Sequence, residues 1–252
     1  MSVYVIAEIG SNHDNSLEQA FRLIEVAAEA GADAAKFQLY RADKLYPGTI
    51  TPGAIPDSWL PGLQAVCVEH DIDFLCSVFD LDTLDAYMSV SPTMIKIASP
   101  EATCRRLLDE AADTGLPLIV STGAMTWADL DLTVDWLGDT EFTLLHCVSA
   151  YPAPPAEMNL SVIPTMRDRY DVPVGLSDHT LGTSASVAAV ALGATIIEKH
   201  LTVDRSLPGA DHPFALEPDE FRQMAVAVRE TLLMLGDGVK RVQPSEDSTD
   251  RR

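Results

Sequence analysis

Eight short apolar runs recur along this chain, and each ends at a charged or hydroxyl-bearing residue before a helix-like stretch begins. The runs are VYVIAE, DAAKFQ, DFLCS, MIKIAS, LIVST, FTLLHCVS, VPVGLSDH and TIIEKH. Strands that alternate with helices favour a parallel sheet, and eight such units in 252 residues predict one closed (β/α)8 TIM barrel, of class α/β. Reactive groups in that fold gather at the C-terminal ends of the strands. The polar run ends therefore predict an active site there.

The stretches between the runs carry apolar residues at three- and four-residue spacing, which predicts helices. We expect these helices near residues 17–30, 58–70, 80–89, 102–114, 126–137, 158–169, 182–192 and 217–235. Two long loops are expected after the second and eighth runs, at 40–57 and 204–218. Residues 1–238 are predicted to form a single barrel domain, and the polar tail 239–252 is predicted to be disordered.

Composition narrows the environment and the partners. The net charge of −21 disfavours nucleic acid, whose phosphates would be repelled; a solvated acidic surface explains the charge, and adaptation to high salt stays open. No run approaches the roughly 18 apolar residues of a membrane span, and the N-terminus lacks a signal-peptide pattern. The four cysteines have no CxxC spacing, which favours free thiols in a reducing cytoplasm.

Two histidines follow neighbouring runs with the same side-chain parity. Ser177 and His179 share one face of the seventh run, and Glu198 and His200 share the corresponding face of the eighth. Two neutral imidazoles with open positions for water and substrate suit a catalytic divalent metal. Simple hydrogen bonding of each histidine near the barrel mouth is the alternative, and the spacing does not decide between them.

Two lysines lie inside apolar runs, where an unpaired ammonium group is costly. Lys36 shares a face with Gln38, and Lys96 precedes Ser99 by three residues. Lysines near strand-end hydroxyls suit an anion such as a phosphate or carboxylate. Pairing with an internal glutamate (Glu8, Glu101 or Glu198) and a Schiff-base role are the two alternatives. Glu8 and Glu101, which follow apolar runs, are also candidate acid–base groups.

Seven motifs together resemble the sialic acid (N-acetylneuraminate) synthase family, which includes synthases of legionaminic and pseudaminic acids. They occur in the family's order and cover the chain from about residue 3 to 236. The motifs are AEIGSNHD (7–14), AAKFQ (34–38), KIASPE (96–101), STGAM (121–125), HCVSAYP (146–152), GLSDHT (175–180), and EKHLT with PGADH (198–212).

The resemblance implies condensation of phosphoenolpyruvate with an open-chain N-acetylated amino sugar, such as N-acetylmannosamine. The products would be a nine-carbon 2-keto acid and phosphate, and a divalent metal, commonly Mn2+ with Mg2+ or Co2+ as alternatives, would assist. The metal would be held by His179 and His200, and Glu101 would lie near the reacting carbons. The sugar would contact Glu8, Gln38, Tyr151 and Asp211. Phosphoenolpyruvate would lie against Lys36, Ser77, Lys96, Ser99, Ser121, Ser149 and Ser177.

The resemblance also implies a homodimer and a small C-terminal domain similar to type III antifreeze protein, which supplies an arginine to the sugar. The sequence ends without that segment, so we expect the sugar side of the site to be incomplete unless a separate protein supplies it. A different aldehyde as the acceptor is the alternative. The acceptor sugar and the metal are not fixed by the sequence. A Schiff-base lysine aldolase of the same fold and a non-catalytic barrel subunit stay as alternative functions.

Overall fold

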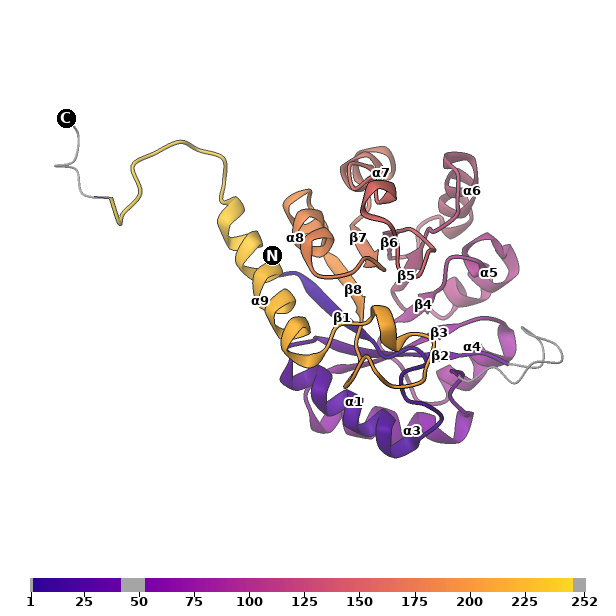
Figure 1. Cartoon of the computed structure of the whole chain (residues 1–252). Helices are drawn as coiled ribbons and strands as arrows, with labels where there is room; N and C mark the ends of the chain where they lie inside the picture. Colours follow the sequence, from indigo (N-terminus) through magenta and orange to yellow (C-terminus); the bar gives the residue numbers. More distant parts are fainter. Residues whose placement is uncertain (1, 42–52, 247–252) are drawn as a thin grey trace.

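The structure, a computed structural model, describes residues 2–41 and 53–246. Eight parallel strands pair in sequence order, and the last pairs with the first, so that the sheet closes into a barrel (Figure 1). The predicted TIM barrel is therefore confirmed. The strands are β1 (Tyr4–Glu8), β2 (Ala34–Leu39), β3 (Asp73–Val78), β4 (Ile95–Ile97), β5 (Leu118–Ser121), β6 (Phe142–Cys147), β7 (Val174–Asp178) and β8 (Ile196–His200).

Helices follow the strands and form a ring around the barrel (Figure 1). Several begin at a side-chain cap: the Ser16 hydroxyl accepts a hydrogen bond from Gln19 N at the start of α1. The helices are α1 (Leu17–Glu29), α3 (Leu60–Glu69), α4 (Leu81–Met88), α5 (Arg105–Asp113), α6 (Trp127–Leu137), α7 (Val162–Tyr170), α8 (Ser184–Ala191) and α9 (Pro218–Leu235).

In some of the apolar runs, the polar residue at the end lies beyond the last residue of the observed strand. β4 ends at Ile97 because the chain turns there: Ala98 O accepts hydrogen bonds from Glu101 N and Ala102 N, both at 3.1 Å. A 3-10 turn, η2 (Glu101–Thr103), follows and delays α5. Ser99 consequently stands on the loop after its strand.

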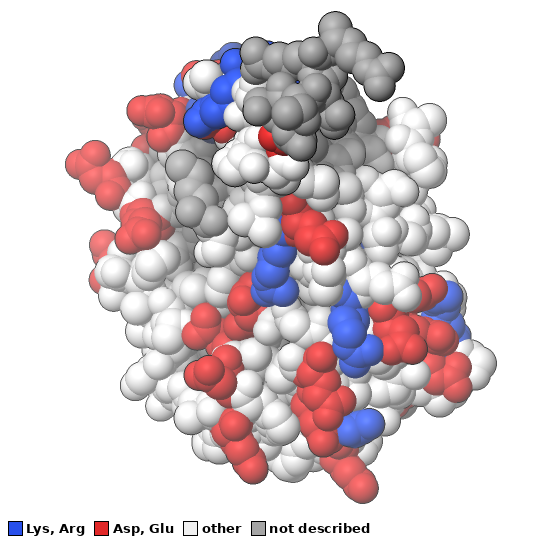
Figure 2. All heavy atoms as spheres, turned by 90° about the vertical axis from the view of Figure 1, so that its left-hand side faces the viewer, with Lys and Arg blue, Asp and Glu red and all other residues white. Residues whose placement is uncertain are grey.

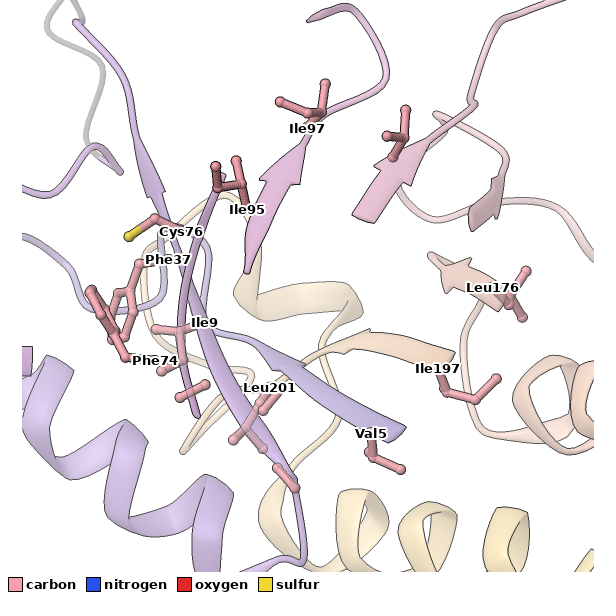
Figure 3. Close-up of a cluster of buried hydrophobic side chains, with 14 of the residues drawn as sticks. Val5, Ile9, Phe37, Phe74, Cys76, Ile95, Ile97, Leu176, Ile197 and Leu201 are labelled. Atoms are coloured by element: carbon pink, nitrogen blue, oxygen red, sulfur yellow. The ribbon is translucent and has the colours of Figure 1, made fainter. Parts of the chain in front are cut away.

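The apolar side chains of the strands form two layers, one outside the barrel wall and one inside it. Outward-facing residues such as Val5, Phe37 and Ile97 pack in the main core between barrel and helices, part of which Figure 3 shows. The alternate positions face the barrel interior and close its lower part with a second cluster. That cluster consists of Ile6, Ala34, Leu75, Ile119, Leu145 and Ile196. Because strand side chains alternate, the next inward position of each strand lies above this layer, towards the strands' C-terminal ends.

The interior leaves no space at one inward position. A Cβ on Gly175 would overlap Ile196 O and lie 2.7 Å from Leu145 Cδ2. Glycine at this place in β7 allows the barrel wall to close tightly below Ser177.

The long loop after β2 was expected at 40–57, but its residues 42–52 lie outside the described residues. Residues 239–246 are exposed and belong to no helix or strand, whereas 247–252 are outside the described part; disorder of the tail stays a prediction. None of the helices described is both long and apolar enough to cross a membrane.

Candidate active site

A cavity of about 280 Å³ opens at the C-terminal ends of the strands. It lies above the apolar layer formed by Ile6 and its neighbours, so every strand directs its next inward side chain into it. Twelve of the fourteen predicted site residues line this cavity. They are Glu8, Lys36, Gln38, Ser77, Lys96, Ser99, Ser121, Ser149, Tyr151, Ser177, His179 and His200.

The other two predicted residues lie beside the cavity. Asp211, on the loop after β8, has its Oδ2 3.8 Å from His200 Nδ1 and accepts a hydrogen bond from Ser11 N at 3.0 Å. Glu101 is buried in η2, and among the described residues its Oε2 has no hydrogen-bond partner. Burial raises the pKa of Glu101 to about 7, against a weaker opposite effect of Lys96. Glu101 can therefore hold a proton near neutral pH.

Glu198 on β8, which the sequence suggested only as a possible partner of a buried lysine, also lines the cavity. Its Oε2 lies 3.7 Å from Lys36 Nζ and 4.0 Å from Lys96 Nζ, and its Oε1 accepts a hydrogen bond from Ser177 at 2.9 Å. Burial alone would raise the pKa of Glu198, but the two lysines hold it well below its usual range. Its inward position agrees with the side-chain parity that it shares with His200.

Lys36 is fully enclosed between two carboxylates. Its Nζ lies 2.6 Å from Glu8 Oε2 and donates to Ser77 Oγ at 3.0 Å. Desolvation lowers the pKa of Lys36, yet Glu198 and Glu8 more than offset this and raise it. The internal ion pairs expected under one interpretation of the lysines are present here. They keep the ammonium group charged inside the cavity.

Lys96 has fewer charged neighbours. Its Nζ donates to Ser121 Oγ at 2.7 Å and to Ile97 O at 3.0 Å. Desolvation lowers the pKa of Lys96, and Glu198 only partly opposes this. A cation with so little compensation at a cavity wall is a strong attractor for an anionic ligand.

Hydroxyl groups surround the cavity next to Lys96. Ser99 Oγ accepts a hydrogen bond from Gly123 N at 2.8 Å, so this backbone amide is already used within the protein. A Cβ on Gly123 would overlap Ser149 Oγ and lie 3.0 Å from Ser99 Oγ. Glycine is thus required for the β5 loop to approach the two hydroxyls. Cys147, which the sequence predicted only to be a free thiol, is buried and also lines this wall.

The two histidines meet across β7 and β8, with ring centroids 5.6 Å apart. His179 Nδ1 lies 2.9 Å from Val148 O, a contact that requires a proton on Nδ1 and leaves the lone pair on Nε2. Desolvation lowers the pKa of His200 to about 4, and its buried Nδ1 has no hydrogen-bond partner in residues 2–41 and 53–246. Each ring therefore has a nitrogen that no backbone carbonyl occupies and that could bind a metal.

These two imidazoles fit a divalent metal as a pair of protein ligands. In the described ranges no group of three or more His, Cys, Asp or Glu side chains has the arrangement of a metal site. Water or substrate would have to complete the coordination.

Tyr151 covers the histidines from the solvent side. Its ring centroid lies 4.2 Å from that of His179 and 5.4 Å from that of Phe214. Tyr151 itself is 55% exposed, so one face of the ring is open to a ligand.

A closed barrel with buried lysines, hydroxyls and paired imidazoles at its strand ends is the arrangement of a TIM-barrel enzyme that acts on an anionic substrate. The chain belongs to the NeuB family, which residues 23–240 match. The predicted membership of the sialic acid synthase family is confirmed.

Two named relatives and one solved structure support this family membership. The spore coat polysaccharide biosynthesis protein SpsE of Bacillus subtilis is 42% identical over 259 residues, which cover 94% of this chain and 69% of the relative. N,N'-diacetyllegionaminic acid synthase of Legionella pneumophila is 35% identical, with 98% of this chain and 77% of the relative covered. A crystal structure of N-acetylneuraminic acid synthetase from Leptospira borgpetersenii, in complex with citrate, superimposes with a TM-score of 0.93 at 35% identity. That match covers 97% of this chain and 89% of the other.

Proposed function

We propose that this barrel condenses phosphoenolpyruvate with the open-chain aldehyde form of an N-acetylated amino sugar, such as N-acetylmannosamine, to give a nine-carbon 2-keto acid and phosphate. The observation that carries this proposal is the placement of Lys36 and Lys96 among strand-end hydroxyls, in one cavity with two imidazoles. The relatives named as synthases of legionaminic and N-acetylneuraminic acids support the same reaction class.

Phosphoenolpyruvate binds through its negative charges. Lys36 and Lys96 attract its carboxylate and phosphate, and the hydroxyls donate hydrogen bonds to the same oxygens. The hydroxyls are those of Ser77, Ser99, Ser121, Ser149 and Ser177. The substrate competes with Glu8 and Glu198 for the ammonium groups, so binding exchanges internal ion pairs for substrate ion pairs.

The acceptor sugar occupies the side of the cavity at β1 and β8. Glu8, which accepts a hydrogen bond from Gln38 at 2.8 Å, can orient sugar hydroxyls, and Tyr151 offers an open ring face. Asp211 approaches the same side next to His200.

The reaction forms one carbon–carbon bond and breaks one carbon–oxygen bond. The enol carbon of phosphoenolpyruvate attacks the aldehyde carbon, and water adds to the carbon that then carries the positive charge. The tetrahedral intermediate expels phosphate and leaves the 2-keto group. Protons must reach the aldehyde oxygen and leave the water, and Glu101 and Glu8, whose pKa values are both raised by burial, can exchange them.

A divalent metal, which we propose to be Mn2+ (with Mg2+ or Co2+ as alternatives), would be held by His179 and His200 and would supply Lewis acidity at the aldehyde oxygen. His179→Ala and His200→Ala should each lower the Mn2+ retained after dialysis, measured by mass spectrometry of the metal, without unfolding the protein. Equal retention by wild type and both variants would contradict the assignment.

A Schiff-base aldolase of the same fold is the second candidate, because burial lowers the pKa of Lys96 and so favours its neutral, nucleophilic form. A non-catalytic barrel subunit is the third, and it gives no account of why two lysines are buried in the cavity.

One experiment separates these functions. Dialysed protein is incubated with phosphoenolpyruvate and N-acetylmannosamine, then with other N-acetylhexosamines, with and without Mn2+, and products are identified by mass spectrometry. The proposal predicts a nine-carbon keto acid that requires both substrates. A parallel incubation with pyruvate and borohydride tests the aldolase. Stable attachment of pyruvate to a lysine there, with no keto acid formed from phosphoenolpyruvate, would favour it.

We place the reaction in a reducing cytoplasm, because all four cysteines lie within the described residues and none forms a disulfide. The homodimer and the separate antifreeze-like protein that the family resemblance implies stay predictions. Size measurement of the purified chain in solution tests the first of them.

A further inference from the structure

The loop after β8 folds back over the barrel mouth and meets the loop after β1. In Figure 1 the orange segment between β8 and α9 runs beside the indigo segment that leaves β1. The two loops are about 190 residues apart in sequence, and three hydrogen-bonded contacts join them. These contacts bring Asp211 to the acceptor side of the cavity.

The first two contacts are made by the backbone and side chains of the β1 loop. Asn12 Nδ2 donates to Leu201 O at 2.9 Å, and Ser11 N donates to Asp211 Oδ2 at 3.0 Å. The second contact holds the same carboxylate whose Oδ2 lies 3.8 Å from His200 Nδ1. The position of Asp211 therefore depends on how closely the two loops approach each other.

The third contact joins a histidine ring to a carboxylate. His212, which is fully buried, places Nε2 3.1 and 3.2 Å from the two carboxylate oxygens of Asp14. Its Nδ1 lies 2.6 Å from Thr202 Oγ1, so both ring nitrogens are fixed. His212 follows Asp211 directly in the sequence. The contacts of its ring therefore hold the loop in place beside Asp211, on the acceptor side of the cavity.

Close packing above this pair leaves no room for another side chain. A Cβ on Gly209 would lie 2.5 Å from His212 Cδ2, 2.8 Å from His212 Nε2 and 3.0 Å from Asp14 Oδ1. Even a methyl group at this position would push apart the two partners. Gly209 is thus a third residue on which the closure of the two loops depends.

The geometry points to His212 and Asp14 as positioning residues that set the affinity for the acceptor sugar by holding Asp211 in place. We name the pair the mouth clasp. This inference rests on the proposed function, and it assigns the clasp to one substrate. The lysines and hydroxyls assigned to phosphoenolpyruvate stand on β2 to β7 or on the loops that follow these strands. In the described part of the chain, none of them makes a hydrogen bond or ion pair with His212 or Asp14.

The test compares Michaelis constants for the two substrates in three variants: Asp14→Ala, Gly209→Ala and the conservative His212→Gln. We expect Asp14→Ala and Gly209→Ala to raise the Michaelis constant for N-acetylmannosamine by about tenfold or more, the scale of a lost hydrogen bond to a charged group. The constant for phosphoenolpyruvate should stay within about twofold. His212→Gln, whose amide can still donate to Asp14, should raise the Michaelis constant for N-acetylmannosamine by a smaller factor. Ser206→Ala, an exposed change on the same loop, is the matched control.

A double-mutant cycle tests whether the clasp acts through Asp211. In an Asp211→Ala background, Asp14→Ala should have little additional effect on acceptor affinity. Additive effects, or equal losses for both substrates, would overturn the positioning role.

Amide hydrogen exchange gives a readout that needs no turnover. In Asp14→Ala the segments 9–16 and 201–217 should exchange faster than in Ser206→Ala, because the loops are no longer fastened. Unchanged exchange would overturn the clasp whatever the enzyme's reaction is. Faster exchange together with an unchanged Michaelis constant for N-acetylmannosamine would overturn the role of the clasp in sugar binding. Failure of the proposed function would appear separately, as wild-type protein that forms no keto acid.

Discussion

Four buried charges stand within ion-pair distance at the centre of the site, and their balance governs anion binding. Glu8 and Glu198 flank Lys36, while Lys96 reaches Glu198 only at 4.0 Å. An arriving anion can therefore gain most from Lys96, whose charge is the least compensated.

Replacement of Lys96 by Met should weaken phosphoenolpyruvate binding far more than sugar binding. Loss of a buried charge-assisted contact typically costs about 1.5–3 kcal/mol, which corresponds to roughly a tenfold to hundredfold rise in the Michaelis constant. Steady-state kinetics with each substrate varied in turn measures this, and Arg105→Met, on the exposed start of α5, is the control. An unchanged constant for phosphoenolpyruvate with a raised one for the sugar would reverse the placement of the two substrates.

The Glu101 carboxyl should make stability depend on pH. Its pKa is about 7 in the folded protein against 4.5 as the ordinary value, so between these pH values the folded state keeps a proton that the unfolded state releases. The free energy of unfolding must fall as pH rises through this interval. Glu101→Gln removes this contribution and should flatten the decline, as urea unfolding from pH 4.5 to 7.5 would measure. Glu110→Gln, an exposed change on α5, controls for the loss of one carboxylate. A decline equally steep in Glu101→Gln would contradict the raised pKa.

Most of these residues could be predicted from the sequence, because the C-terminal ends of the strands meet at one face of a barrel. Glu198 was expected only as one of three possible partners of the lysines, because a sequence does not show which carboxylate faces a lysine across the barrel. The sequence could not predict that Glu101 lies beside the cavity and not in its wall, since that depends on the turn at Ala98.

At the scale of elements, the strands present their inward and outward residues in strict alternation. One outward ion pair joins β7 to β8, the two strands at whose ends the histidines lie. Asp178 on β7 and Lys199 on β8 pair at 3.1 Å, and both are buried. Asp178 also accepts hydrogen bonds from Thr180 N at 2.9 Å and Ser186 Oγ at 2.6 Å. The pair lies between barrel and helices, directly behind the histidine positions.

Lys199→Met should destabilise the protein strongly, because it leaves the Asp178 carboxylate buried beside an apolar side chain. Breaking such a buried pair from one side costs about 3–5 kcal/mol. The double change Lys199→Met with Asp178→Asn should recover part of the loss, and urea unfolding measures both. Arg22→Met, in the exposed pair with Glu25, is the matched control and should change the unfolding free energy little. A loss no larger than that of Arg22→Met would show that the pair contributes nothing.

Strand and helix positions could be predicted because periods of two and 3.6 residues are local properties. All eight strands and the helices at 17–29 and 218–235 lie where the patterns placed them. The clasp between the β1 and β8 loops could not be predicted, because neither loop has a repeating pattern and their contact depends on barrel closure.

At the scale of the whole molecule, the acidic surface and the cationic cavity wall are separate features. Figure 2 shows Asp and Glu side chains spread over the face that carries α9, with fewer Lys and Arg among them. Lys36 and Lys96, in contrast, are buried in the cavity. Anion binding inside an acidic protein therefore depends on a few enclosed cations, and the repulsion of nucleic acid stays a prediction from the net charge.

The cavity at the strand ends is proposed to join phosphoenolpyruvate to a sugar aldehyde with cleavage of the carbon–oxygen bond. The most direct measurement follows phosphoenolpyruvate labelled with 18O at the oxygen that bridges carbon and phosphorus, in the presence of the acceptor sugar and Mn2+. We predict that released phosphate carries the label, in equal amount to the keto acid formed, and that release requires the sugar. Unlabelled phosphate would contradict cleavage of the carbon–oxygen bond. Labelled phosphate released equally well without the sugar would contradict the condensation.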